Sequence, residues 1–181
     1  EAFAAVAKRL KGIDGKKVAA LAGDLADCES MMALKDLMTA LDCPNIDCRQ
    51  DGAKLDPSNR CAYLFNTSIA GIDAADACLL IGTNPRLEAP VLNARLRKRS
   101  MEGAFPIGVI GPEADLTYAY DHLGVGPDIL EQLISGRHRF AKVLKQAERP
   151  MLILGQGALA RDDGMAVLDL ARAIAEKTGM V

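Results

Sequence analysis

Aromatic residues are scarce in this chain of 181 residues, which has no tryptophan, three tyrosines and four phenylalanines. Because half of the residues are nevertheless apolar, alanine, leucine, isoleucine and valine must fill the hydrophobic core. A chain of this length fits one domain, which buries about 70% of the surface of its unfolded form. We therefore expect residues 1–181 to form a single domain.

A large excess of charge of one sign is also missing. The 22 basic and 24 acidic residues give a formal net charge of -2, which provides no electrostatic reason to bind nucleic acid or an anionic membrane. No stretch approaches the roughly 18 consecutive apolar residues of a membrane span, and the N-terminus lacks the layout of a signal peptide. We expect a soluble chain with no nucleic-acid partner and no direct membrane insertion. Because it opens on Glu1 in a helical pattern, we also expect a fragment of a longer chain.

The cysteines have no spacing typical of a metal or disulfide site. They are odd in number and irregularly placed, and no two form a Cys-x-x-Cys pair: Cys28, Cys43, Cys48, Cys61 and Cys78. Cys43 and Cys48 are separated by four residues, as in part of a plant-type ferredoxin pattern, but the third cysteine of that pattern is absent. This usage predicts reduced thiols in a cytosolic compartment and no metal-binding residues. We expect Cys78 to be a small buried apolar residue in a strand.

Motifs of stand-alone catalysis are absent as well. His122 and His138 lie far apart in the sequence with no cysteine beside them, so a metal pair has little support. There is neither a Gly-x-Ser-x-Gly elbow nor a Gly-Lys-Ser/Thr phosphate loop. We predict no catalytic residues in this chain.

The most informative stretch that is present begins with an uninterrupted apolar run, Ala77–Ile81. Such a run predicts a strand covered on both faces, as in a parallel sheet. A loop is predicted to follow from Gly82 to Ala89, and it opens with Gly82, Thr83, Asn84 and Pro85. Ligands of open parallel sheets bind at the carboxyl ends of the strands, so this loop is a candidate binding site. An ordinary connection between a strand and a helix is the competing interpretation.

The remaining patterns alternate between strands and helices. Pro90 fits the first turn of a helix whose Val91, Leu92 and Leu96 would face a sheet. Basic residues crowd the C-terminal end of this helix, where the helix dipole favours positive charge. We prefer this explanation of the basic cluster to a binding surface. Further strands are predicted at 17–22, 46–49, 105–110 and 151–154, and further helices at 2–10, 27–41, 127–136, 140–147 and 162–179. The alternation predicts an α/β fold, a three-layer Rossmann-like arrangement around a mostly parallel sheet of about five strands.

Local signals indicate the faces and ends of three of these helices. In the first helix, Phe3, Val6 and Leu10 would share one side. Asp27 would cap the second helix, whose buried face would carry Met31, Leu34, Met38 and Leu41. The last helix would be capped near Asp162 or Asp163.

A second glycine-rich segment, GQGALA, follows the last predicted strand and opens a helix. Its Gly155 and Gly157 match the phosphate-binding fingerprint of dinucleotide-binding proteins. The acidic residue expected about 20 positions on, at the end of another strand, is missing, because Glu176 falls within the closing helix. Arg86 in the first loop could neutralise a phosphate. Both groups of glycines could equally serve tight turns after strands.

Several longer segments carry a resemblance to a known family. They are TSIAGIDAADACLLIGTNPRLEAPVLNARLRK (67–98), GPEADLTYAYDHLG (111–124), SGRHRFAKVLKQAERPMLILGQGAL (135–159) and RDDG (161–164). Together they resemble the large peripheral-arm subunits of respiratory complex I, the NADH:quinone oxidoreductase, called the G subunit in bacteria and the 75 kDa subunit in mitochondria. The GTNP motif alone is shared with the wider molybdopterin oxidoreductase superfamily, which includes formate dehydrogenase and DMSO reductase.

This resemblance implies an inherited α/β domain whose ligand has been lost. In the molybdenum enzymes such loops bind molybdopterin guanine dinucleotide, and Gly82, Thr83, Asn84 and Pro85 match one of them. The complex I subunit is understood to carry iron–sulfur clusters in a cysteine-rich region that this chain lacks. The resemblance thus implies a structural scaffold in respiratory electron transport, with no cofactor in this fragment and with the clusters elsewhere in the parent subunit.

The implied partners are the rest of the same subunit and other peripheral-arm subunits, on the cytoplasmic or matrix side of the membrane. Two alternatives remain. One is a functional binding site for a nucleotide or for molybdopterin guanine dinucleotide, as in a molybdenum oxidoreductase. It would be formed by Gly82, Thr83, Asn84, Pro85, Arg86, Gly155 and Gly157. The other is the central domain of a thiamine-diphosphate enzyme, with which the run DLTYAYDHLG is hard to reconcile.

Overall fold

The computed structural model describes residues 1–23, 25–48 and 52–180. These residues cluster into two compact units, which fall within residues 1–51 and 52–181. The expectation of one domain over residues 1–181 stays a prediction. The strands are divided accordingly: two form one parallel sheet and four form another. Every strand pairing in the described ranges is parallel, which confirms the predicted α/β class with a parallel sheet. The sequence pattern could not reveal that the strands belong to different sheets, since it carries no information on which strands pair.

The smaller unit is a strand–helix–strand arrangement preceded by a helix. Its elements are α1 (Ala2–Leu10), β1 (Ala20–Leu21), α2 (Cys28–Ala40) and β2 (Ile46–Asp47). As predicted, Asp27 caps α2, its carboxylate accepting the Ser30 N–H at 2.7 Å. Both strands are shorter than predicted, and Arg49 of the second lies outside the described residues.

The core of the smaller unit is small. Met38 of α2 is buried with Ala20 and Cys43, and the partly buried Leu34 and Leu41 pack against them. Met31, which we expected on the same buried face, is 37% exposed, and Met38 is the residue of α2 that is buried.

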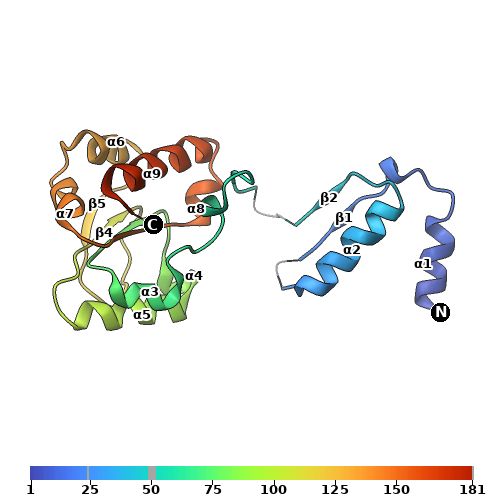
Figure 1. Ribbon diagram of the computed structural model, residues 1–181, viewed down its shortest axis with the longest axis horizontal. Helices are drawn as coiled ribbons and strands as arrows, with labels where there is room; N and C mark the ends of the chain where they lie inside the picture. The colour runs from blue at the N-terminus through green and yellow to red at the C-terminus, as the bar shows by residue number, and fades with distance from the viewer. Residues whose placement is uncertain (24, 49–51, 181) are drawn as a thin grey trace. The chain divides into compact units, whose positions relative to one another are not determined.

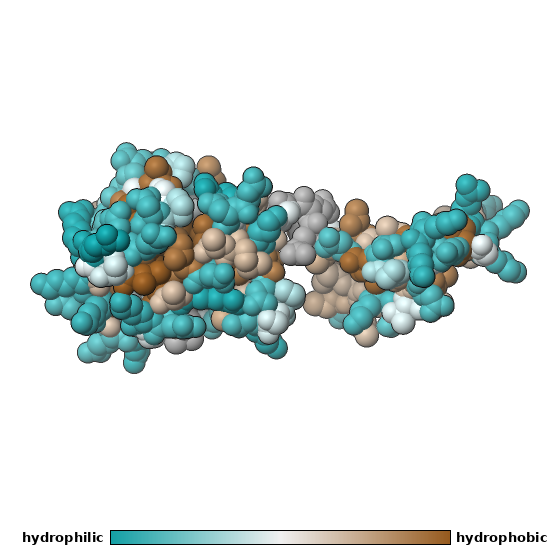
Figure 2. Space-filling model, turned by 90° about the horizontal axis from the view of Figure 1, so that it is seen from above, coloured by the Kyte–Doolittle hydropathy of each residue, from teal (hydrophilic) through white to brown (hydrophobic). Residues whose placement is uncertain are grey.

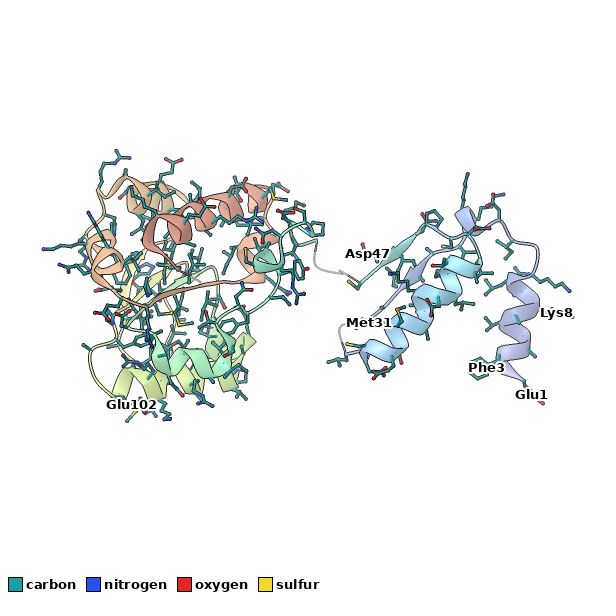
Figure 3. All side chains as sticks on the ribbon, viewed as in Figure 1. Glu1, Phe3, Lys8, Met31, Asp47 and Glu102 are labelled. Carbon is teal, nitrogen blue, oxygen red and sulfur yellow. The ribbon has the colours of Figure 1, made fainter. Side chains whose placement is uncertain are left out.

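Helix α1 has no buried residue. Phe3 and Val6, expected to mark a buried side, are 92% and 55% exposed. Figure 3 shows Phe3 and Lys8 on opposite sides of α1, so the helix is amphipathic without covering anything within its own unit.

The larger unit contains a four-stranded sheet between two layers of helices. Its elements are α3 (Ser68–Gly71), β3 (Ala77–Ile81), α4 (Pro85–Glu88), α5 (Pro90–Met101), β4 (Ile107–Ile110), β5 (Asp121–Gly124), α6 (Asp128–Ser135), α7 (Phe140–Gln146), β6 (Pro150–Leu154), α8 (Gln156–Leu159) and α9 (Gly164–Thr178). Figure 1 shows α6, α7 and α9 on one side of the strands and α3 and α5 on the other. The three-layer arrangement that we predicted is therefore present in this unit.

The order of strands in this sheet is β5-β4-β3-β6. All five residues of β3 are buried, as the uninterrupted apolar run predicted. Leu79 and Ile81 belong to the cluster under α6, α7 and α9, while Cys78 and Leu80 belong to the cluster under α5. This alternation makes β3 the central strand of the hydrophobic core.

Helix boundaries in the larger unit follow local signals closely. Pro90 is the first residue of α5, and Gly136 ends α6 in the left-handed conformation with φ +76°. Asp163 precedes α9, but its side chain makes no cap bond and pairs with Arg161 at 2.6 Å instead. The prediction of an aspartate cap at this helix was therefore right in position and wrong in the contact made.

Two expectations for this unit were wrong. Strand β5 was not predicted, because DHLG has only one buried residue and lacks an apolar run. Val91 is 75% exposed, whereas Leu96 is fully buried and Leu92 packs against the core. Leu92 and Leu96 are four residues apart and share the face of α5 that packs on the core, whereas position 91 is turned about 100° away from Leu92 around the helix.

The basic residues of α5 mostly bond to the protein itself. Arg95 pairs with Asp73 at 2.8 Å, and Arg99 donates to the Ala75 carbonyl at 2.8 Å and lies over the Phe105 ring. These contacts support the interpretation that the cluster is structural.

Apolar side chains also reach the surface of the larger unit, and Figure 2 shows hydrophobic residues gathered between hydrophilic ones.

Candidate functional site

The two glycine-rich loops lie next to each other at the carboxyl ends of β3 and β6, which are neighbouring parallel strands. The Gly155 N–H donates to the Ile81 carbonyl at 2.8 Å, and the Gly82 N–H donates to the Ile110 carbonyl at 2.8 Å. The strand order changes direction here, since β4 lies on one side of β3 and β6 on the other. This is the position at which open α/β sheets form a ligand crevice.

The backbone of the protein itself closes much of that crevice. Gly82 has φ +56°, and a Cβ added there would run into Ala158 of α8. A Cβ at Gly155 would run into the Gly82 carbonyl oxygen. Both residues must therefore be glycine so that the two loops can pack together, a sufficient structural reason for them without any phosphate. Gly157 is less constrained, because a Cβ there would lie 3.4 Å from the nearest atom, the Gly82 oxygen.

The donors of the first loop are occupied by a carboxylate of the same loop. Glu88 accepts the Asn84 backbone N–H at 2.6 Å and the Thr83 hydroxyl at 3.0 Å. Pro85, the first residue of the one-turn helix α4, is buried and has no N–H to offer. The prediction of an irregular loop up to Ala89 missed α4, which is only four residues long. Glu88 therefore stands where an anionic ligand group would have to bind.

The predicted cation of this loop is also engaged. The Arg86 guanidinium forms an ion pair with Asp115 at 2.5 Å and donates to the Asp115 carbonyl at 3.0 Å. The Thr117 N–H, together with Arg86, lowers the pKa of the Asp115 carboxyl below its usual range. Arg86 is thus held by a carboxylate and would have to leave it to bind a phosphate.

A cavity of about 410 Å³ opens beside the first loop. Its lining includes Gly82, Thr83 and Asn84, the turns after β4 and β5, and Gly157 from the second loop. Glu88 and Glu113 add carboxylates, and the side-chain oxygen of Asn84 is buried without a hydrogen-bond partner. The one arginine in the lining, Arg161, is paired with Asp163. Such an acceptor-rich lining disfavours an anion and favours a neutral or donor-bearing group.

One further polar pair borders this cavity and was not predicted from the sequence. The Nδ1 atom of His122, on β5, lies 3.2 Å from the Glu113 carboxylate, and its Nε2 atom lies 2.8 Å from the Gly111 carbonyl oxygen. Because a carbonyl only accepts, Nε2 carries a hydrogen. The pair could only be found once β5 was known to lie beside β4, since nothing in the local sequence links the two residues.

Within the described ranges, no cluster of three or more histidine, cysteine, aspartate or glutamate residues could hold a metal ion. Cys78 is fully buried in β3, where burial raises the pKa of its thiol, and behaves as the small apolar residue that the sequence suggested. Among the helices of the described part of the chain, none is long and apolar enough to cross a membrane.

The chain is similar in sequence to proteins named as subunits of NADH dehydrogenases. The chain is 41% identical over all 181 residues to the mitochondrial NADH dehydrogenase [ubiquinone] iron-sulfur protein 1 of Solanum tuberosum, and covers 24% of that protein. It is 44% identical over 177 residues to the NADH-quinone oxidoreductase G subunit of Rickettsia bellii, covering 98% of this chain and 26% of the relative. The G subunit of Rickettsia prowazekii is 41% identical over 181 residues, with 27% of that protein covered.

The chain therefore spans about a quarter of the length of the curated relatives that it matches. The resemblance found in the sequence motifs is confirmed by this similarity, which extends over the smaller unit as well as the larger one. The pattern of the family described as Molybdopterin oxidoreductase matches residues 1–181. The chain therefore belongs to the molybdopterin oxidoreductase family.

Proposed function

We propose that this chain is a non-catalytic scaffold region of the large peripheral-arm subunit of NADH:quinone oxidoreductase. Its relatives of 41–44% identity are named as subunits of that enzyme, and the similarity covers 96–100% of the chain. The whole enzyme would oxidise NADH and reduce quinone, while this region would hold the fold of its subunit. The partners are the rest of the same subunit and neighbouring peripheral-arm subunits, on the cytoplasmic or matrix side of the membrane.

The observation that carries the scaffold role is the position of the Glu88 carboxylate. It takes the Asn84 N–H and the Thr83 hydroxyl, the two donors that would hold a phosphate of a molybdopterin guanine dinucleotide. The residues of this chain do not fit that cofactor, because a bound pyrophosphate would face Glu88 and Glu113 and would have to free Arg86 from Asp115. We infer that this fragment holds no cofactor and that iron–sulfur clusters belong to other parts of the parent subunit.

The test replaces the matching region of a bacterial G subunit with this chain and follows assembly of the peripheral arm together with NADH-quinone oxidoreductase activity. The scaffold role predicts that both are retained. The variants Glu88→Gln and Arg86→Gln, which alter the candidate site without removing core residues, should leave the activity of the assembled enzyme unchanged. Assembly with normal yield but loss of activity in either variant would contradict a purely structural role.

The second candidate function is a competent nucleotide site in the cavity beside Gly82. It is favoured by the cavity of about 410 Å³ and by the position of both glycine-rich loops at the change in strand order. Thermal-shift titration of the purified chain with guanine nucleotides, NADH, flavins and molybdopterin guanine dinucleotide separates the two candidates. A ligand at about 100 times its dissociation constant adds roughly 2.7 kcal/mol to the free energy of unfolding. A shift of that size would favour the nucleotide site, and no shift supports the scaffold.

A further inference from the structure

Among the strands of residues 1–23, 25–48 and 52–180, β6 forms one edge of the four-stranded sheet and pairs with β3 alone. The Gly155 N–H donates to Ile81 of β3, and peptide groups alternate in direction along a strand. The peptide groups of Met151 and Ile153 therefore face β3, and those of Leu152 and Leu154 face away. In the described part of the chain, no hydrogen bond satisfies these outward groups of Leu152 and Leu154.

A groove of about 430 Å³ runs along this open edge. Leu152 and Leu154 contribute to its lining, the segment 59–67 forms one wall, and α9 forms the other. Leu64 and Phe65 in the first wall are 44% and 38% exposed, although both are large apolar residues. A strand placed in the groove would therefore meet apolar side chains on both of its faces.

The groove also contains an unsatisfied donor. Arg172 of α9 lines it, and the Nε atom of this residue is buried without a hydrogen-bond partner. The other end of the guanidinium is held by Asp56 through an Nη2–Oδ2 bond of 2.7 Å, so the side chain is fixed in place. A backbone carbonyl entering the groove could accept from such a donor, and unpaired buried donors are uncommon in complete structures.

The opposite edge of the sheet differs in chemistry. Strand β5 carries Asp121, which is exposed and pairs with Arg139 at 3.1 Å. Charged side chains on an edge strand prevent further strands from pairing with it. The sequence of β6, PMLIL, has no charge at all. The sheet is therefore protected at β5 and open at β6.

We propose that the open edge of β6 binds a fifth strand, supplied by a segment of the same subunit outside residues 1–181. This inference rests on the proposed function, because the named relatives are about four times as long as the region matched here. The expected segment is a run of about four to six aliphatic residues without charge, like Ala77–Ile81 and Ile107–Ile110. It pairs with the Leu152 and Leu154 peptide groups and covers Leu64 and Phe65.

The test measures amide hydrogen exchange by NMR in the purified 181-residue chain, residue by residue. The probes are overlapping 15-residue peptides covering the parts of the Rickettsia bellii G subunit that lie outside the matched region. Without peptide, the amides of Leu152 and Leu154 should exchange rapidly, and those of Met151 and Ile153 slowly. One apolar peptide should slow exchange at Leu152 and Leu154 at least tenfold, without changing the amides of β5.

A matched pair of variants controls for fold. Ala175 and Ala173 are two residues apart on α9, and neither belongs to a core cluster, but only Ala175 lines the groove. Ala175→Arg should abolish the protection caused by the peptide, and Ala173→Arg should retain it. If both variants lose the peptide-induced protection to the same extent, the groove is not the binding site of the peptide.

Three other outcomes would also overturn the proposal. The Leu152 and Leu154 amides could already be protected in the monomeric chain, which would mean that the edge is not open. Protection that rises with protein concentration and with dimer formation would assign the edge to a second copy of the chain. If none of the peptides protects these amides, the fifth strand does not come from the same subunit. None of these readouts depends on enzyme assembly, so failure here is distinguishable from failure of the proposed function.

Discussion

Truncation of Leu80 to alanine tests whether β3 is the centre of the larger unit. Leu80 is fully buried, and its strand is hydrogen-bonded to β4 on one side and to β6 on the other. The substitution removes three carbons, worth about 0.8 kcal/mol each as transfer free energy, or roughly 2.4 kcal/mol. Because strands on both sides prevent β3 from moving into the cavity, we expect a total loss of about 3–5 kcal/mol of unfolding free energy.

The assay is urea unfolding followed by tyrosine fluorescence. All three tyrosines lie in the larger unit, at Tyr63, Tyr118 and Tyr120, so the signal does not report on residues 1–51. The midpoint should fall while the slope with urea stays constant, as a change in stability alone requires. The control Val91→Ala alters a side chain that is 75% exposed, and it should change the unfolding free energy by no more than about 0.5 kcal/mol.

A loss below about 1 kcal/mol for Leu80→Ala, with the slope unchanged, would refute this reasoning. It would mean that the strand is peripheral or that its surroundings collapse into the cavity. An equal loss in Leu80→Ala and Val91→Ala would point to the same conclusion, since the two side chains differ in burial and in little else that matters for the transfer free energy.

Two further predictions concern the loop contacts and the response to acid. Gly155→Ala should lower the unfolding free energy by about 1–3 kcal/mol because its Cβ would meet backbone, whereas Gly157→Ala should be neutral or slightly stabilising. The Ser58 hydroxyl and then Arg172 lower the pKa of Asp56 to about 2, so its contribution to stability is present above about pH 4 and is lost as the pH falls toward 2. Ser58→Ala should raise the pKa of Asp56 in a carbon-13 NMR titration, and an unchanged pKa would contradict this assignment.

The candidate site was predictable only in part. The sequence indicated both glycine-rich loops and their positions after strands, and the structure brings Gly82 and Gly155 into contact. It did not indicate that Glu88 would occupy the donors at Thr83 and Asn84, since many side chains could have met them. The available signal was the spacing of Asn84 and Glu88, a carboxylate four residues after a loop N–H. This spacing is also common where no such hydrogen bond forms, so it could not predict the contact. Whether the seven predicted residues bind any ligand stays a prediction.

The sequence by itself determined the elements whose causes are local. The apolar run at Ala77–Ile81, the cap at Asp27, Pro90 at the start of α5 and Gly136 at the end of α6 all express preferences of a few neighbouring residues. Only the tertiary structure decided what depends on residues far apart in the chain. It separated the strands into two sheets, created β5 from a mostly polar segment, and left the β6 edge open. Strand pairing and side-chain contacts are set by long-range packing, which a single sequence does not display.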